Sequence, residues 1–206
     1  MCPFSDDESI SMGGTIAKYS TEGKKVIVII FSYGEASLPH LKPEYVKEVR
    51  LKETEQVSKV LGINQTVFLG LPDAKLKEYE HDKKLIKKVK SLIKTYNPEK
   101  IFTHSETDPH HPGDHKAVYN VVTKAVDSIK KEYDLFTFEV WNIIPENKPV
   151  MYVDVSKYFN IKIKAISLFK SQWFSVILTI LPVYIRAIKY GLKAKCRYAE
   201  KFYKIR

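Results

Sequence analysis

Histidine and acidic side chains crowd the stretch from Thr103 to Val118, which reads THSETDPHHPGDHKAV. It concentrates groups that bind metals or transfer protons, namely Asp108, His110, His111, Asp114 and His115. Histidine is the commonest metal ligand, and a neighbouring carboxylate can orient an imidazole through its second ring nitrogen. The same stretch also suits a turn followed by a helix, with Asp114 as the N-cap. Three histidines within six positions favour a metal or catalytic site over a turn alone.

A second acidic cluster, Asp6-Asp7-Glu8, lies near the start of the sequence and is followed by Gly13 and Gly14. Acidic residues before a helix are also favoured by the helix dipole alone. The paired glycines allow a close approach of the backbone to a neighbouring group. A parallel sheet can bring this acidic loop beside the histidine-rich loop, and the residues alone leave open whether the two loops form one metal site.

Both loops need a sheet to position them, and the hydrophobic pattern indicates its strands. Short apolar runs predict strands at 26–31, 66–71, 100–103, 136–141 and 150–155. Helical patterns alternate with them at 43–61, 82–96, 114–131, 156–166 and 182–203. This alternation predicts an α/β fold with a mostly parallel sheet. Acidic loops of this kind usually follow a buried strand, but only Met1 to Phe4 offer one, so we expect the first strand to be short or missing.

Length and charge limit the classes of function. A chain of 206 residues is most simply one domain. The net charge of +10 permits binding to nucleic acid or anionic lipid, and a basic surface-binding protein is therefore one alternative. The lysines are spread over helices and no nucleic-acid motif is present, so we expect a solvated surface and no nucleic-acid partner. The two cysteines form no metal-like spacing, and a cytoplasmic location is expected.

The longest apolar stretch runs from Trp173 to Ile185 and contains Pro182. It is shorter than a bilayer-spanning helix requires, so the sequence predicts no transmembrane span. We expect this stretch to pack in the core or to form a contact between the subunits of a homo-oligomer. No Gly-x-Gly-x-x-Gly turn follows a predicted strand, which disfavours a dinucleotide-binding protein.

Several short motifs occur in the order found in one enzyme family. They are Asp6-Asp7-Glu8, Gly13-Gly14-Thr15, Tyr33-Gly34-Glu35, Arg50-Leu51-Lys52-Glu53, Phe68 to Asp73, His111 to Val118, and Tyr198 to Tyr203. In these motifs the chain resembles the PIG-L/LmbE-like deacetylases. The resemblance implies a Rossmann-like three-layer fold, with residues 1–206 as a single domain whose C-terminal helical part covers about 157–206. It also implies zinc-dependent removal of the N-acetyl group from an N-acetylglucosamine-type substrate.

The resemblance assigns catalytic and metal-binding roles to matching positions. Asp6 matches the general base, and Asp7 and His115 match zinc ligands. His111 matches the histidine that assists the tetrahedral intermediate, although the motif spacing leaves His110 as an alternative.

The remaining assignments concern the substrate and the catalytic loop. Asp114 joins the catalytic group, and Gly13, Gly14 and Arg50 are expected to line the sugar pocket. The implied partner is an N-acetylated amino sugar and the implied cofactor is Zn²⁺.

One position departs from the family pattern. Phe4 stands where the family has a zinc-binding histidine, and Ser5 stands where it has a proline. Phenylalanine cannot coordinate a metal, and a catalytic zinc usually has three protein ligands. Loss of one ligand is expected to weaken or abolish zinc binding, and with it activity, unless His110 or another group takes the place of the missing histidine. The alternative is a catalytically impaired member that binds a sugar or a protein partner.

Overall fold

The computed structural model describes residues 1–109, 113–140, 144 and 148–206 of the chain. Its helices and strands follow in this order: α1 (Asp7–Thr21), β1 (Ile27–Ser32), α2 (Pro43–Leu61), β2 (Gln65–Leu71), η1 (Leu76–Tyr79), α3 (Lys83–Tyr96), β3 (Lys100–His104), α4 (Asp114–Asp127), β4 (Asp134–Phe138), β5 (Val150–Asp154), α5 (Phe159–Ile166), η2 (Lys170–Gln172), α6 (Trp173–Ala194) and β6 (Ala199–Lys204).

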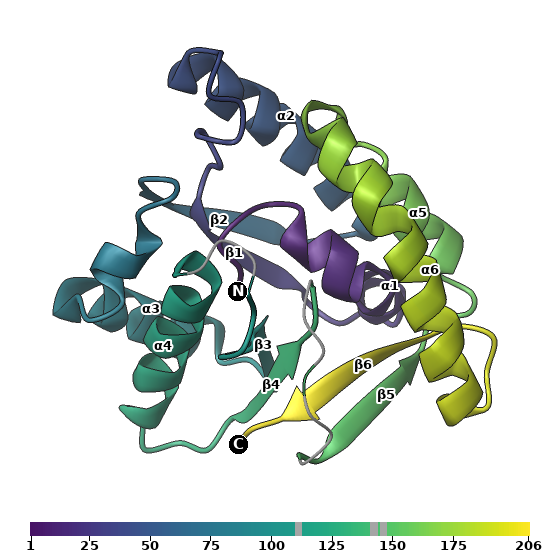
Figure 1. The fold of residues 1–206 in the computed structure, drawn as a ribbon. Coiled ribbons are helices and arrows are strands. Elements are labelled where there is room, and N and C mark those ends of the chain that lie inside the picture. The colour runs from purple at the N-terminus through teal and green to yellow at the C-terminus, as the bar shows by residue number, and fades with distance from the viewer. Residues whose placement is uncertain (110–112, 141–143, 145–147) are drawn as a thin grey trace.

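The strands of the described residues form two sheets (Figure 1). β1 and β2 pair in parallel, and the second sheet has the order β3-β4-β6-β5. β3 and β4 are parallel, whereas β6 is antiparallel to both β4 and β5. The fold is therefore mixed α/β, and the expected mostly parallel sheet is not confirmed.

The helices and strands in the middle of the chain begin and end close to where local sequence signals predict. Helix α2 ends at Gly62, which adopts the left-handed conformation (φ 72°) that glycine tolerates without strain. Helix α3 begins after Asp82, whose carboxylate accepts hydrogen bonds from the backbone N–H groups of Lys84 and Leu85. These elements, together with strands β1 to β3, lie within one or two residues of the predicted ranges.

The predicted helix at 182–203 is wrong at both ends. Helix α6 begins at Trp173 and stops at Lys195, which adopts the left-handed conformation (φ 56°). The chain then returns as strand β6, which lies between β4 and β5. The charged Glu200 and Lys201 hid this strand, because both are buried here although charged residues usually face solvent.

The first residues of the chain lie beside β1. Cys2 forms an isolated parallel bridge with Ile30, and the N–H of Ser32 donates to the carbonyl of Pro3. A single bridge therefore lies where the first strand was expected to be short or missing, and no strand precedes α1 among the described residues. Helix α1 follows and is kinked at Met12, where φ and ψ leave the helical region.

Two hydrophobic clusters lie on opposite sides of the strands. Helices α3 and α4 pack against β1 and β3 in one cluster, while α1, α2, α5 and α6 pack together with β4 to β6 in the other. Figure 1 shows this layered arrangement, with the N-terminus near the centre of the molecule. The layers bring the starts of α1 and α4 to the carboxyl end of β3.

Helix α6 buries only one of its faces. Val183 and Ala187 belong to the core, whereas the opposite face is exposed and apolar: Trp173, Phe174, Ile177, Leu178, Leu181, Ile185, Ile188 and Leu192. The apolar helix is longer than the stretch recognised in the sequence. The segment Lys170–Ala194 meets the length and hydropathy of a membrane span, with 28% of its most apolar window buried, which alone is weak evidence of one.

Candidate metal and catalytic site

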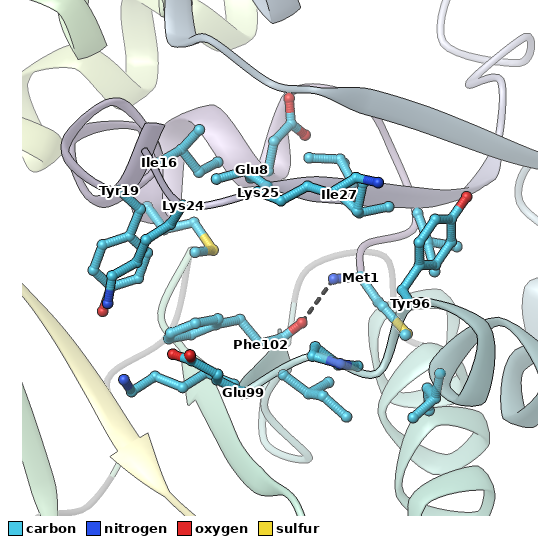
Figure 2. A pocket seen from close by; sticks show the side chains of 18 of the residues that line it. Met1, Glu8, Ile16, Tyr19, Lys24, Lys25, Ile27, Tyr96, Glu99 and Phe102 are labelled. Atoms are coloured by element: carbon cyan, nitrogen blue, oxygen red, sulfur yellow. Dashed lines mark hydrogen bonds between the residues drawn. The ribbon is translucent and has the colours of Figure 1, made fainter. Parts of the chain in front are cut away.

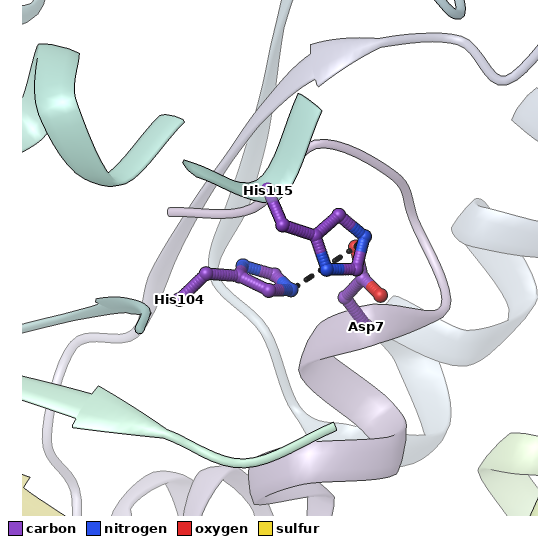
Figure 3. Close-up of side chains that lie close together, drawn as sticks. All are labelled: Asp7, His104 and His115. Atoms are coloured by element: carbon purple, nitrogen blue, oxygen red, sulfur yellow. Dashed lines mark ion pairs between the residues drawn. The ribbon is translucent and has the colours of Figure 1, made fainter. Parts of the chain in front are cut away.

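Three side chains from separate elements converge at the carboxyl end of β3 (Figure 3). Asp7 lies in the first turn of α1, His104 ends β3, and His115 lies in the first turn of α4. All three are buried, and one potential ligand atom of each lies within 4.8 Å of the others. Asp7 Oδ2 is 3.5 Å from His104 Nε2 and 3.9 Å from His115 Nε2. One carboxylate and two imidazoles are a donor set that suits zinc and related divalent metals.

The surroundings of these residues fit a bound cation. Neither ring nitrogen of His104 has a hydrogen-bond partner among the described residues, although the side chain is fully buried. A buried polar group without a partner is costly, and a metal ion would satisfy it. His115 Nδ1 lies 3.2 Å from Asp108 Oδ2, a contact that orients the ring and leaves Nε2 for a ligand.

The electrostatic environment favours the protonation states in which Asp7 and His104 can bind a metal. Burial raises the pKa of Asp7, but the adjacent His104 and His115 outweigh it, and the net pKa lies below the usual range. Burial lowers the pKa of His104, and the neighbouring His115 lowers it further. Asp7 therefore stays ionised and His104 stays neutral, which are the forms that bind a metal. For His115, burial is outweighed by Asp7 and Asp108, so its pKa is raised without a metal.

Asp6 lies next to this group and is held by Arg50. The guanidinium of Arg50 lies 3.4 Å from Asp6 Oδ1, and its Nε donates to the carbonyl of Tyr33 at 3.0 Å. Burial raises the pKa of Asp6, while Arg50 opposes that shift and Asp7 adds to it. A carboxylate with a raised pKa, fixed in place beside a metal site, is suited to accept a proton.

A cavity of about 130 Å³ opens beside these carboxylates. Residues from six parts of the chain line it: Phe4, Asp6, Asp7, Ile10, Gly34, Ala36, Ser37, Arg50, Asp73, Ala74, His115, Gln172 and Ser175. Asp6, Asp7, Arg50 and His115, to which the resemblance assigned roles, thus line one cavity. A small polar group of a ligand can reach the candidate metal site through it.

The two glycines predicted to line the sugar pocket lie elsewhere. A Cβ atom on Gly14 would lie 2.8 Å from Val155 Cβ, and one on Gly13 would lie 3.1 Å from Lys162 Cγ. Neither glycine is among the described residues that line the cavity. Their lack of a side chain lets α1 pack closely on α5 and the residues before it.

Asp114 contributes through a backbone contact. Its Oδ1 accepts a hydrogen bond from the N–H of Leu76 at 3.0 Å, which ties η1 to the start of α4. The N-cap position of α4 is Gly113, so the alternative reading of Asp114 as the N-cap is wrong. By joining two elements, Asp114 fixes the turn of α4 that carries His115.

His110 and His111 lie outside the described residues, so their predicted roles stay predictions. The sequence reasoning did not assign a role to His104. Its signal was its place as the last residue of the central strand, where a parallel strand delivers functional side chains. The histidine-rich pattern of the loop that follows pointed to His110 instead.

Phe4 lies close to the candidate ligands without contributing one. Its ring centroid is 6.0 Å from that of His115, and its backbone N–H donates to Asp7 Oδ2 at 3.2 Å. The main chain at this position therefore helps to orient the carboxylate. His104 brings the number of potential ligands to three despite the phenylalanine.

Comparison with known families identifies similar proteins. A model of the GlcNAc-PI de-N-acetylase family, PIG-L, matches residues 2–126. A 1D-myo-inositol 2-acetamido-2-deoxy-alpha-D-glucopyranoside deacetylase from Saccharomonospora viridis is 30% identical over 146 residues, covering 59% of this chain and 54% of that protein. The chain thus spans about half the length of this curated relative.

Two solved structures share the fold over nearly the whole chain. N,N'-diacetylchitobiose deacetylase from Pyrococcus horikoshii aligns with a TM-score of 0.84 and 22% identity, covering 99% of this chain and 81% of that one. GalB, a 4-carboxy-2-hydroxymuconate hydratase from Pseudomonas putida, aligns with a TM-score of 0.83 and 19% identity, covering 100% and 96%. At these identities the comparison establishes the fold alone.

Proposed function

Because this chain belongs to the PIG-L family of GlcNAc-PI de-N-acetylases, we propose that it hydrolyses the N-acetyl group of an N-acetylglucosamine-type saccharide. Water is consumed, the amide C–N bond breaks, and the products are acetate and a free amine. The observation that carries the proposal is the Asp7, His104 and His115 group with Asp6 beside it. The Saccharomonospora viridis relative, whose name describes deacetylation of such a glucosaminide, supports the substrate class.

Asp7, His104 and His115 would hold the metal, for which we propose Zn²⁺. When bound, zinc polarises the acetyl carbonyl and makes the attacking water more acidic. Asp6 takes the proton from that water and then delivers it to the leaving amine. Arg50 keeps the Asp6 carboxylate aimed at the cavity through its contacts with Asp6 and the Tyr33 carbonyl.

The substrate enters the 130 Å³ cavity with its acetamido group foremost. Arg50 lies at the cavity wall, where its remaining donor capacity is available to sugar hydroxyls. The role proposed for His111, or alternatively for His110, is to assist the tetrahedral intermediate. Asp114 supports this arrangement by fixing the start of α4.

The alternative is a catalytically impaired relative that binds a sugar or a protein partner without cleaving it. It rests on Phe4, which supplies no ligand. His104 favours an active enzyme instead, since it offers a third donor from a strand end and has no other partner among the described residues. GalB shares the fold and is a hydratase. Measuring acetate release therefore distinguishes deacetylation from a hydratase reaction.

A second alternative, a basic surface-binding protein, is favoured by one observation. Residues 155–199 contain nine lysines and arginines and no acidic residue, and they include the exposed apolar face of α6. Such a helix suits the surface of an anionic membrane. Sedimentation with phosphatidylserine vesicles tests whether the protein binds anionic membranes. Binding that does not weaken as the salt concentration rises would contradict this alternative. A homo-oligomer, a cytoplasmic location and the absence of a nucleic-acid partner stay predictions.

The proposed function is tested by measuring acetate released from N-acetylglucosamine and diacetylchitobiose by zinc-loaded protein. We expect release by the unaltered chain and by His40→Ala, which changes an exposed histidine. We expect none from Asp6→Asn or His115→Ala. If both variants release acetate as fast as the unaltered chain, the proposed site is wrong. If the unaltered chain binds zinc and the saccharide but releases no acetate, the impaired alternative holds.

A further inference from the structure

The exposed apolar face of α6 is the part of the fold that its own core leaves uncovered. The eight large apolar side chains of this face are between 46% and 76% exposed, from Trp173 at the first residue of the helix to Leu192 in its last turn. Figure 1 shows α6 along the edge of the molecule. A contiguous exposed apolar surface of this kind marks a contact with a membrane or another protein.

The apolar cavity inside the molecule does not offer such a surface. It has a volume of about 500 Å³ and lies between β1, β3 and α1, where the amino group of Met1 donates to the carbonyl of Phe102 (Figure 2). Ile16 and Ile29 line it and are 1% and 3% exposed. A membrane cannot reach such buried side chains, whereas it can reach those of α6.

Positive charge surrounds the exposed apolar face of α6. Nine lysines and arginines and no acidic residue occur between positions 155 and 199. Lys170 lies just before the helix, Lys189 lies in its second half and Lys195 follows its end, and all three are exposed. The face is therefore apolar along its length and basic at both ends.

We propose that the exposed apolar face of α6 is a docking surface for an anionic lipid membrane, with the helix lying in the plane of the membrane. Apolar side chains of such a helix enter the boundary between headgroups and acyl chains, where an aromatic ring such as that of Trp173 is favoured. Lysines at the ends of the helix lie among anionic headgroups and add attraction to them.

Charge favours a membrane over a second copy of the chain. Each copy has a net charge of +10, and both ends of the docking surface are basic. Two such surfaces packed together would place lysines of one copy near lysines of the other, whichever way the helices run. The segment from 155 to 199 has no acidic residue to offset this repulsion. Anionic headgroups offset the same charges.

Contacts on the opposite face of α6 favour docking over crossing of the membrane. Val183 and Ala187 pack in the core, and Arg186 donates to the carbonyls of Glu139 and Val140. The strand that follows, β6, pairs with both β4 and β5. A membrane-spanning α6 would lose these contacts, whereas a helix that lies on the surface keeps them.

The docking surface adjoins the candidate site. Gln172 and Ser175 line the cavity of about 130 Å³, and Trp173 and Phe174 between them are exposed. Docking therefore brings this cavity close to the lipid surface. The relation to catalysis rests on the proposed function, but the docking itself does not.

Sedimentation with vesicles of equal parts phosphatidylserine and phosphatidylcholine tests the surface. We expect binding that weakens as salt is added, and little binding to phosphatidylcholine alone. Phe174→Ser combined with Leu178→Ser should weaken binding by about 10-fold or more, because two exposed apolar side chains are lost. Both positions are exposed, so the melting temperature should stay close to that of the unaltered chain.

A matched pair of charge variants separates this surface from the charge of the whole protein. Lys170→Ala combined with Lys189→Ala should weaken binding by about 10-fold. Lys87→Ala combined with Lys88→Ala removes the same charge from exposed positions on α3 and should change binding little. An equal loss in both double variants would overturn the proposal, since total charge would then explain the binding.

Quenching of tryptophan fluorescence by brominated lipid gives a local readout. Trp173 should be quenched on binding, and Trp173→Phe should bind with the quenched component removed. A chain that binds no vesicles, and whose oligomer dissociates with the Phe174 and Leu178 variant, would overturn the proposal in favour of a second copy. Protein that resists extraction from vesicles by alkaline washing would overturn it in favour of a spanning helix. These measurements use no catalysis, so their failure is distinguishable from failure of the acetate assay.

Discussion

Glu200 forms a buried junction whose loss should strongly destabilise the fold. Its carboxylate accepts hydrogen bonds from the N–H groups of Gly14 at 3.0 Å and Thr15 at 2.7 Å, and from Lys162 Nζ at 2.5 Å. Glu200 and Lys162 are 4% and 3% exposed. Glu200→Gln leaves the Lys162 ammonium buried without its counter-charge. Breaking a buried pair in this way costs about 3–5 kcal/mol.

That free energy is large against a total stability of about 5–15 kcal/mol. For a chain of this size about 1 kcal/mol corresponds to about 2–4 °C, so the melting temperature should fall by about 6–20 °C. Calorimetry at pH 7 measures the shift. Glu55→Gln is the matched control, since Glu55 and Lys59 form an exposed pair whose loss should barely move the melting temperature.

The loss should also depend on pH. Burial lowers the pKa of Lys162, Arg186 lowers it too, and Glu200 opposes both. Without Glu200 the folded-state pKa falls further below the unfolded value of 10.5, so the unfolded state binds more protons. The variant should therefore gain stability relative to the unaltered chain as pH rises toward 10.5. An equal deficit at pH 7 and pH 9.5, or none at either, would refute this account of the junction.

Three further predictions concern the site and its supports. Asp108→Asn should weaken zinc binding by about 10- to 100-fold, measured by chelator competition, because His115 loses its orienting carboxylate; unchanged affinity would contradict this. Arg50→Lys should lower kcat for acetate release by about 10- to 100-fold with the fold intact, since a lysine cannot contact both Asp6 and Tyr33. An unchanged kcat would show that Arg50 does not position Asp6 for catalysis. Gly14→Ala should destabilise the fold by about 1–3 kcal/mol in urea unfolding through its contact with Val155, and a neutral result would show that α1 can shift.

The sequence predicted those parts of the fold that depend on local signals. Gly62 and Asp82 mark helix ends through their own backbone and side-chain preferences, and both did so correctly. Strand β6 depends on a distant partner, because Glu200 is buried only where Lys162 and two backbone N–H groups meet it. No local pattern reports such a junction, so the sequence predicts a helix where this strand lies.

The candidate site also combines residues that local motifs predict with one that only the tertiary packing reveals. Asp7 and His115 stand in recognisable loop motifs, and the structure brings them together. His104 belongs to the strand and not to the loop, so its place among the ligands follows only from the packing of β3 against the starts of α1 and α4. Gly13 and Gly14 follow the acidic cluster closely in the sequence. In the structure, however, helix α1 is kinked at Met12 and Gly14 packs against Val155, so these glycines serve helix packing.

We propose that His104 supplies the third metal ligand that Phe4 does not. The most direct test of this claim is the zinc content of protein purified without chelators, for the unaltered chain, His104→Ala, and His104→Ala combined with Phe4→His. We expect about one zinc per chain, a loss in the single variant, and at least partial recovery in the double variant. A His104→Ala protein that is folded and retains its full zinc content would contradict the claim.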